Sequence, residues 1–374
     1  MPFCLARCKY CGFVSGPHDP ALEAIYVDSV TREIALWAAK SSPSHPFNNL
    51  KADTLYFGGG TPSLLVPDEL ATIVRACKEH FYLAPQSEIS LEINPGTVGR
   101  AQLHELRQTG FNRASLGIQS LNNEDHRRMG RLHSANQAID TFQDLRTAGF
   151  HNVSIDLIAG YPGQTMEAFL ESLTHSLDLR PEHISVYLLE LKKGTRLELE
   201  IAESVTPLID DDLVADMYEE LCRLIEEHGY EQYEISNFAL PGFRSRHNLK
   251  YWQDVPFLGI GTGAHGMTGR VRYAHSEDVS SYISAITAGE LPFSTFTQLT
   301  PEERFKDALI MGLRLVEGID LVQLGNRYRT NALSFVIRTI GDLIESGLSS
   351  ITDGRLQLTP RGRLLSNEVF TRWI

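Results

Sequence analysis

The chain has 374 residues, of which 42% are hydrophobic and 22% charged, a globular mixture that excludes a disordered or collagen-like chain. This length fits one barrel-sized domain and a small additional unit. The 34 basic and 47 acidic residues give a net charge of −13, which disfavours nucleic acid as a partner. The sequence shows no signal peptide and no apolar run of about 18 residues, so we expect a cytoplasmic protein.

The five cysteines are an odd number, which argues against a disulfide framework. Cys77 and Cys222 lie in helical patterns and are expected to pack as small hydrophobic side chains. Cys4, Cys8 and Cys11 form a C-x3-C-x2-C run, a spacing that favours an iron–sulfur cluster. Three ligands would leave one iron of a [4Fe-4S] cluster open to an external ligand. Structural zinc remains the alternative, although it needs a fourth Cys or His nearby.

In chain order, short β-branched runs alternate with amphipathic stretches. The runs predict strands at 54–57, 88–93, 113–118, 153–158 and 184–189, and the stretches predict helices at 68–80, 101–109, 135–148 and 166–177. Strands that alternate with helices form a parallel sheet with the helices outside. Polar and glycine-rich residues fall near the carboxyl end of each strand, where barrels bind ligands.

The pattern changes after residue 210. A long helix is predicted at 211–228, followed by an aromatic and glycine-rich connecting segment and a C-terminal unit of helices with a hairpin at Asp353-Gly354. This unit resembles a winged-helix module, but its net charge of about +1 favours packing or a lid over DNA binding. We therefore divide the chain into a barrel at 1–236, a connecting segment at 237–299 and a C-terminal domain at 300–374.

The motif G-G-G-T-P-S at 58–63 directly follows the first predicted strand. Consecutive glycines let the backbone approach a ligand, although alone they could form only a tight turn. Together with the cysteine run, the motif resembles the radical S-adenosylmethionine (SAM) superfamily and, within it, the oxygen-independent coproporphyrinogen III oxidase family. This resemblance implies an α/β fold: a partial (βα)6 TIM-like barrel with a C-terminal helical, winged-helix-like domain.

The resemblance also implies cofactors and their ligands. Cys4, Cys8 and Cys11 would hold a [4Fe-4S] cluster whose open iron binds SAM. The residues implied to contact SAM are Phe13, Gly59, Gly60, Thr61, Glu92, Gln119, Arg131 and Asp156. Taken singly, an acid at a strand end often caps a neighbour, and Arg131 could instead pair with Glu124 or Asp125. Family members also have a strand before the first cluster cysteine, so we expect a barrel that lacks its first strand.

Phe13 occupies a position where coproporphyrinogen oxidases have a further cysteine. The segments Y-E-I-S-N-F-A (233–239), R-H-N-L-K-Y-W (246–252) and G-I-G-T-G-A-H-G (259–266) are instead similar to the heme chaperone branch, HemW. This likeness implies a protein that binds heme and transfers it to apo-hemoproteins such as respiratory enzymes. A membrane-associated recipient and a homodimer are further expectations.

His247 is the candidate heme ligand, and His265 is a weaker one. Each could equally be a hydrogen-bonded structural histidine. The alternative function is that of a radical SAM enzyme, a coproporphyrinogen III dehydrogenase-like oxidoreductase that acts on a tetrapyrrole. No catalytic residue can be named from the sequence.

Overall fold

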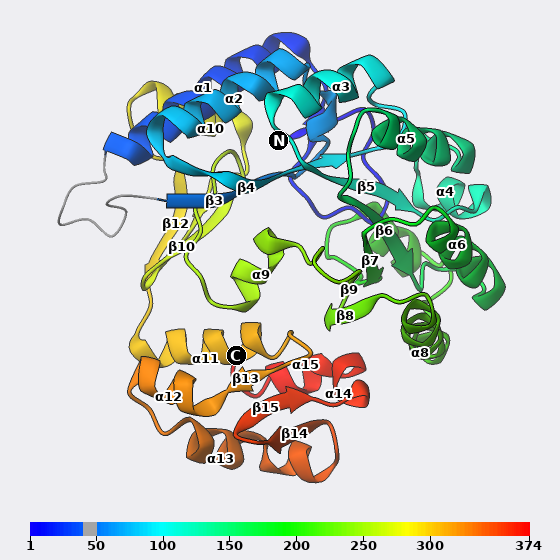
Figure 1. Ribbon diagram of the computed structural model, residues 1–374, viewed down its shortest axis with the longest axis vertical. Helices are drawn as coiled ribbons and strands as arrows, with labels where there is room; N and C mark the ends of the chain where they lie inside the picture. Colours follow the sequence, from blue (N-terminus) through cyan, green and yellow to red (C-terminus); the bar gives the residue numbers. More distant parts are fainter. Residues whose placement is uncertain (40–50) are drawn as a thin grey trace.

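The computed structural model describes residues 1–39 and 51–374, and its largest element is a curled seven-stranded sheet (Figure 1). Five strands run parallel, as predicted, and two short strands continue the sheet in antiparallel pairing. In spatial order they are β3 (Lys51–Phe57), β4 (Tyr82–Ile93), β5 (Arg113–Gln119), β6 (Val153–Ala159), β7 (His183–Leu188), β9 (Asn237–Ala239) and β8 (Glu231–Glu234). Within the described residues the sheet therefore holds five parallel strands, one fewer than a (βα)6 unit.

Helices cover the convex face of this sheet (Figure 1). They are α2 (Pro67–His80), α3 (Arg100–Thr109), α4 (Asn123–Met129), α5 (Ala135–Thr147), α6 (Met166–Asp178) and α8 (Asp211–Glu227). The segment E-I-S-L-E-I of β4 shows why: Ile89, Leu91 and Ile93 join the main hydrophobic core, while the alternate residues lie on the concave face. The convex face of the half-barrel is therefore apolar and packs against the helices, while its concave face is polar.

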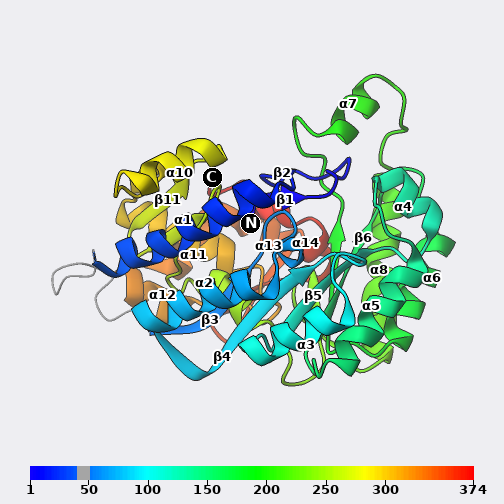
Figure 2. The ribbon, with the colours of Figure 1, turned by 90° about the horizontal axis from the view of Figure 1, so that it is seen from above.

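The N-terminal segment lies across the top of the half-barrel (Figure 2). Here β1 (Phe3–Cys4) pairs with β2 (Gly16–Pro17), and the loop between them carries Cys8 and Cys11. α1 (Pro20–Ala39) follows and packs against α2. The short η1 (Pro62–Leu64) follows the glycine motif, and α7 (Arg196–Ala202) projects from the same end of the molecule (Figure 2).

The connecting segment contains more regular structure than its sequence predicted. α9 (Arg246–Trp252) lies on the concave side of the sheet, and β10 (His265–Thr268), β11 (Val271–His275) and β12 (Phe293–Gln298) form a separate antiparallel sheet (Figure 1). α10 (Val279–Thr287) packs against α1. The boundary drawn at residue 236 falls between β8 and β9, which pair with each other in the main sheet.

The C-terminal unit has a hydrophobic core of its own, built around Phe305, Val336 and Leu356. Its elements are α11 (Pro301–Gly312), β13 (Ile319–Asp320), α12 (Leu321–Tyr328), α13 (Ala332–Glu345), β14 (Ser349–Thr352), β15 (Arg355–Leu358), α14 (Pro360–Leu364) and α15 (Ser366–Phe370). The predicted hairpin is confirmed: Asp353 and Gly354 connect β14 to β15 with φ values of 51° and 76°, both in the left-handed region. In the described ranges, no helix is both long and apolar enough to cross a membrane.

Candidate functional site

Polar side chains gather on the concave face near the carboxyl ends of the parallel strands. Asp156 on β6 accepts hydrogen bonds from Ser115 Oγ on β5 at 3.1 and 2.9 Å and from Ser154 Oγ at 3.2 Å. Burial raises the pKa of the Asp156 carboxyl, although these donors oppose the shift. A half-buried carboxyl with fixed donors is thus available to a ligand that enters the half-barrel.

Glu92 is a second carboxyl on the same face, and it is half-buried. Tyr56 donates its hydroxyl to Glu92 Oε1 at 2.7 Å, and the Gly59 N–H donates to Oε2 at 3.2 Å. Burial raises the pKa of Glu92 to about 7, against the lowering effect of the Tyr56 hydrogen bond. Glu92 therefore changes charge near neutral pH, and one hydroxyl holds its orientation.

The glycine motif makes room for the first cysteine. The Gly60 N–H donates to Met1 O at 2.6 Å, and a Cβ at Gly60 would lie 2.7 Å from Phe3 O and 3.1 Å from Cys4 Sγ. Gly59 has a φ of 111°, which side chains rarely adopt. The sequence predicts that the backbone of the glycine motif approaches a ligand closely. In the structure, the backbone of this motif lies against the N-terminal segment of the chain.

The cysteine loop is fastened to two neighbouring elements. Lys9 N–H donates to Met129 O at 3.0 Å, and Leu197 N–H donates to Lys9 O at 2.8 Å. In the part of the chain that the structure describes, no three His, Cys, Asp or Glu side chains are arranged as a metal-ligand set. Cys4, Cys8 and Cys11 are free thiols.

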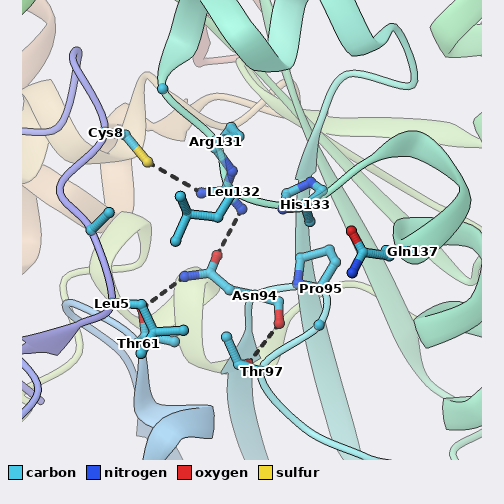
Figure 3. Close-up of a pocket in the computed structure, with 13 residues that line it drawn as sticks. Leu5, Cys8, Thr61, Asn94, Pro95, Thr97, Arg131, Leu132, His133 and Gln137 are labelled. Atoms are coloured by element: carbon cyan, nitrogen blue, oxygen red, sulfur yellow. Dashed lines mark hydrogen bonds between the residues drawn. The ribbon is translucent and has the colours of Figure 1, made fainter.

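Arg131 connects the cysteine loop to the strand ends (Figure 3). Its Nη1 lies 3.6 Å from Cys8 Sγ, and its Nη2 donates to Asn94 Oδ1 at 2.8 Å and to Gly117 O at 2.5 Å. Asn94 in turn donates from Nδ2 to Thr61 Oγ1 at 2.7 Å, and the same Thr61 oxygen lies 3.4 Å from Cys4 Sγ. A cavity of about 110 Å³ lies beside this chain of contacts, so a small part of a ligand could reach Arg131 and Thr61 together.

Arg131 is buried, and its Nε has no hydrogen-bond partner in the described residues. The alternative pairing with the acids of α4 is wrong: Glu124 pairs with Arg127 and Arg128, and Asp125 pairs with Arg128. An unsatisfied guanidinium nitrogen beside a cavity favours an anionic ligand group there.

The remaining candidates lie at different distances from this group. Gln119 ends β5 with a φ of 68°, and a Cβ placed at Gly117 would lie 3.1 Å from its Nε2 and 3.6 Å from Arg131 Nη2, so both side chains lie beside Gly117. The Phe13 ring is 67% exposed on the cysteine loop. His265 begins β10 and is exposed. The structure therefore brings Gln119 to the strand ends and leaves the other two at the surface.

His247 lies on α9, whose N-terminus is capped by the Ser245 side chain. Its Nδ1 is 2.9 Å from Thr54 Oγ1 and its Nε2 is 2.8 Å from Tyr251 OH, so hydroxyls engage both ring nitrogens. The ring also stacks on Tyr56 at a centroid distance of 5.0 Å and an interplanar angle of 18°. Burial lowers the pKa of His247 to about 4, which keeps the ring neutral at pH 7.

Tyr56 and Asn94 are two residues that the sequence reasoning missed. Tyr56 joins Glu92 to His247, and Asn94 joins Arg131 to Thr61. The sequence held a signal for these residues. The polar residues of E-I-S-L-E-I alternate with apolar ones, so a polar residue that continues this alternation, or that faces the same side from the next strand, is a candidate site residue.

Comparison with known proteins agrees with this geometry. A family model described as the radical SAM superfamily matches residues 1–175, and one described as the HemN C-terminal domain matches residues 299–365. Heme chaperone HemW from Bacillus subtilis is 32% identical, with 99% of this chain and 96% of that protein aligned. The chain belongs to the radical SAM superfamily and, within it, to the HemW family. The resemblance inferred from the sequence is confirmed.

Two further relatives and one solved structure are also similar to this chain. Heme chaperone HemW from Lactococcus lactis is 31% identical over 100% of this chain and 96% of its own. The mitochondrial radical S-adenosyl methionine domain-containing protein 1 of Mus musculus is 33% identical over 85% of this chain and 72% of its own. Coproporphyrinogen III oxidase (HemN) from Escherichia coli matches the structure with a TM-score of 0.86 at 23% identity, covering 100% of this chain and 88% of that one. The last comparison confirms the predicted fold.

Membership in the radical SAM superfamily implies a [4Fe-4S] cluster and SAM. The residues present fit these groups in kind: three free thiols on β1 and the loop that follows it, half-buried carboxyls at Glu92 and Asp156, and an Arg131 Nε that lacks a partner in the described residues.

Proposed function

We propose that this HemW-family protein binds heme at α9 and transfers it to apo-hemoproteins such as respiratory enzymes. The observation that carries the proposal is a shared side chain. Tyr56 stacks on His247 with its ring and donates its hydroxyl to Glu92, so the candidate heme helix and the candidate SAM carboxyl contact the same residue. Relatives that carry the name heme chaperone HemW support the assignment.

In this proposal, the half-barrel holds the cluster and SAM. Cys4, Cys8 and Cys11 provide the thiolates of a [4Fe-4S] cluster, which with SAM can supply reductive radical chemistry when both are bound. Arg131 pairs with the SAM carboxylate and, with Gln119, fixes its orientation. The SAM contacts with Gly59, Gly60, Thr61, Glu92 and Asp156, and with Phe13 at the surface, belong to the same proposal.

His247 has the protonation state that a heme ligand needs. A pKa of about 4 leaves a neutral imidazole at pH 7, and a neutral imidazole can offer a nitrogen lone pair to iron. Ligation requires that one of the two hydroxyl partners, Thr54 or Tyr251, releases its ring nitrogen. Heme binding at this residue is therefore coupled to a local rearrangement at Thr54 of β3 or at Tyr251 of α9. His265 is the second candidate, and it needs no such release because it is exposed.

The division of the chain at residues 236 and 299, a homodimeric state and recipients that include membrane-associated respiratory enzymes remain parts of this proposal. Inner-face residues of the half-barrel would serve the cluster and SAM, and α9 with the neighbouring segment would serve the cargo.

Heme titration of the anaerobically reconstituted protein tests the proposal. We expect one heme per chain with a Soret band, a much weaker band in His247→Ala and an unchanged band in His104→Ala, an exposed histidine on α3. Transfer of the bound heme to an apo-hemoprotein should follow. Absence of heme uptake, or steady formation of 5′-deoxyadenosine coupled to conversion of a tetrapyrrole, would instead support the enzyme alternative.

A further inference from the structure

A second cavity lies far from the cysteine loop in the fold, where the β10–β12 sheet meets α11 and α12 (Figure 1). Its volume is about 380 Å³. The seven residues that line it are Gly269, Arg270, Pro301, Arg304, Arg327, Tyr328 and Arg329. Four of the seven are arginines and none is acidic, in a chain whose net charge is −13.

Arg304 forms a buried support behind the cavity, and Arg327, whose side chain is 50% exposed, pairs with the same carboxylate. Arg304 is only 5% exposed, and its Nη2 pairs with Asp254 Oδ1. Asp254 also pairs with Arg327 at 3.0 Å and accepts a hydrogen bond from Tyr328. Asp307 lies 3.9 Å from Arg304 Nη1 and pairs more closely with Arg272. Both nearby carboxylates are thus engaged, and Arg304 Nη1 still has no hydrogen-bond partner in the described residues.

The other two arginines are exposed and make no ion pair or side-chain hydrogen bond within residues 1–39 and 51–374. Arg270 lies on the turn between β10 and β11. Arg329 caps the C-terminus of α12 with a φ of 54°, in the left-handed region that non-glycine residues rarely adopt. Cations at a helix C-terminus also interact favourably with its carbonyl groups, which accounts for Arg327 and Arg329 but not for Arg270.

We propose that this cavity binds a small ligand through oxyanion groups, either carboxylate or phosphate. Guanidinium groups form paired hydrogen bonds to both kinds of group, and several of them around one cavity favour a ligand with more than one negative charge. The site is separate from the cluster loop and does not require that the protein carry heme. Asp254, which pairs with Arg304 and Arg327 behind the cavity, lies two residues after the end of α9, so these ion pairs connect the cavity lining to the segment that follows the candidate heme helix.

The test uses isothermal titration of the whole protein with inorganic phosphate and, separately, with succinate, in a buffer without other multivalent anions. We expect saturable binding of at least one probe, which weakens as sodium chloride is added. Binding of phosphate alone identifies a phosphoryl ligand, binding of succinate alone a carboxylate ligand, and binding of both a site selective only for charge.

The variant Arg270→Gln/Arg329→Gln removes the two arginines that have no side-chain partner in the described chain, so its fold should be retained. We expect at least about a tenfold loss of affinity, because two charged donors are removed. The control Arg75→Gln/Arg361→Gln makes the same charge change at two exposed arginines elsewhere and should bind like the unmodified protein. If neither probe binds, or if both double variants lose affinity equally, the proposal is overturned.

Discussion

Removal of one hydroxyl, in Tyr56→Phe, tests the link between the two candidate sites. The aromatic ring and its stacking on His247 are retained, while Glu92 Oε1 loses its donor at 2.7 Å. A hydrogen bond to a charged group contributes about 1.5–3 kcal/mol, which corresponds to a rise of roughly one to two units in the pKa of Glu92. In the unmodified protein that pKa is already about 7.

The consequence for SAM follows from the charge on Glu92. At pH 7.5 about three quarters of the carboxyl is ionised in the unmodified protein, and this fraction falls to between about a quarter and a thirtieth in the variant. If the ionised form binds SAM, affinity should fall by about 3- to 25-fold at pH 7.5 and recover toward that of the unmodified protein at pH 9.5.

Isothermal titration of both reconstituted proteins with SAM at the two pH values measures the effect. Tyr82→Phe removes a hydroxyl from an exposed tyrosine on the same strand as Glu92 and should change nothing. Equal affinity of Tyr56→Phe and the unmodified protein at pH 7.5, or the same deficit at both pH values, would show that the Tyr56 hydroxyl does not control the charge of Glu92.

Three further substitutions test the glycine motif, the proposed SAM contact of Arg131 and the buried carboxyl of Glu33. Gly60→Ala should destabilise the protein by about 1–3 kcal/mol and lower its iron content, because the added Cβ would meet Phe3 O and Cys4 Sγ. Gly99→Ala is the control in thermal unfolding, because a Cβ at Gly99 would have no atom closer than 3.9 Å, and equal stability of the two variants would contradict the prediction. In Arg131→Lys, the lysine side chain cannot reach Cys8, Asn94 and Gly117 together, so the affinity for SAM should fall at least about tenfold. Circular dichroism should show an intact fold, and an unchanged affinity would show that Arg131 does not contact SAM. Burial raises the pKa of Glu33 from 4.5 to about 7, so folding takes up a proton between these pH values, and the Glu33 side chain lowers the free energy of unfolding by about 3 kcal/mol as pH rises from 5 to 8. The variant Glu33→Gln should lack this loss in urea unfolding, and an identical pH dependence in both proteins would show the assignment to be wrong.

The parallel part of the fold could be predicted because local pattern and tertiary packing agree there. The five strands and the helices α2, α3, α5, α6 and α8 lie within a few residues of their predicted bounds at most ends, since each has one apolar face against a common core. β4 is the main exception, because it begins six residues before the predicted strand.

Structure formed by distant or polar partners could not be predicted. α1 buries Glu23, Ser29 and Glu33 among its apolar residues, which obscures a helical stripe. The strands β10 and β11 are short and carry glycine or charged residues, so only their mutual pairing identifies them. These elements depend on contacts between segments far apart in the chain.

The site shows the same division. The cysteines, the glycine motif and the strand-end acids could be named from motifs, because each motif is local. The contact of His247 with Thr54 could not, since Thr54 lies 193 residues away in sequence and meets the ring only because α9 lies on the concave side of the sheet. The tight packing of Gly60 against Cys4 is likewise a property of the folded chain.

The most direct test of the account is the spectrum of the reduced, anaerobically reconstituted protein before and after addition of SAM. We expect about four irons per chain and an electron paramagnetic resonance signal that SAM shifts, because an open iron accepts a further ligand. A variant with serine at positions 4, 8 and 11 should hold no cluster. A signal that SAM leaves unchanged, or iron retained by the serine variant, would contradict the assignment of the three cysteines.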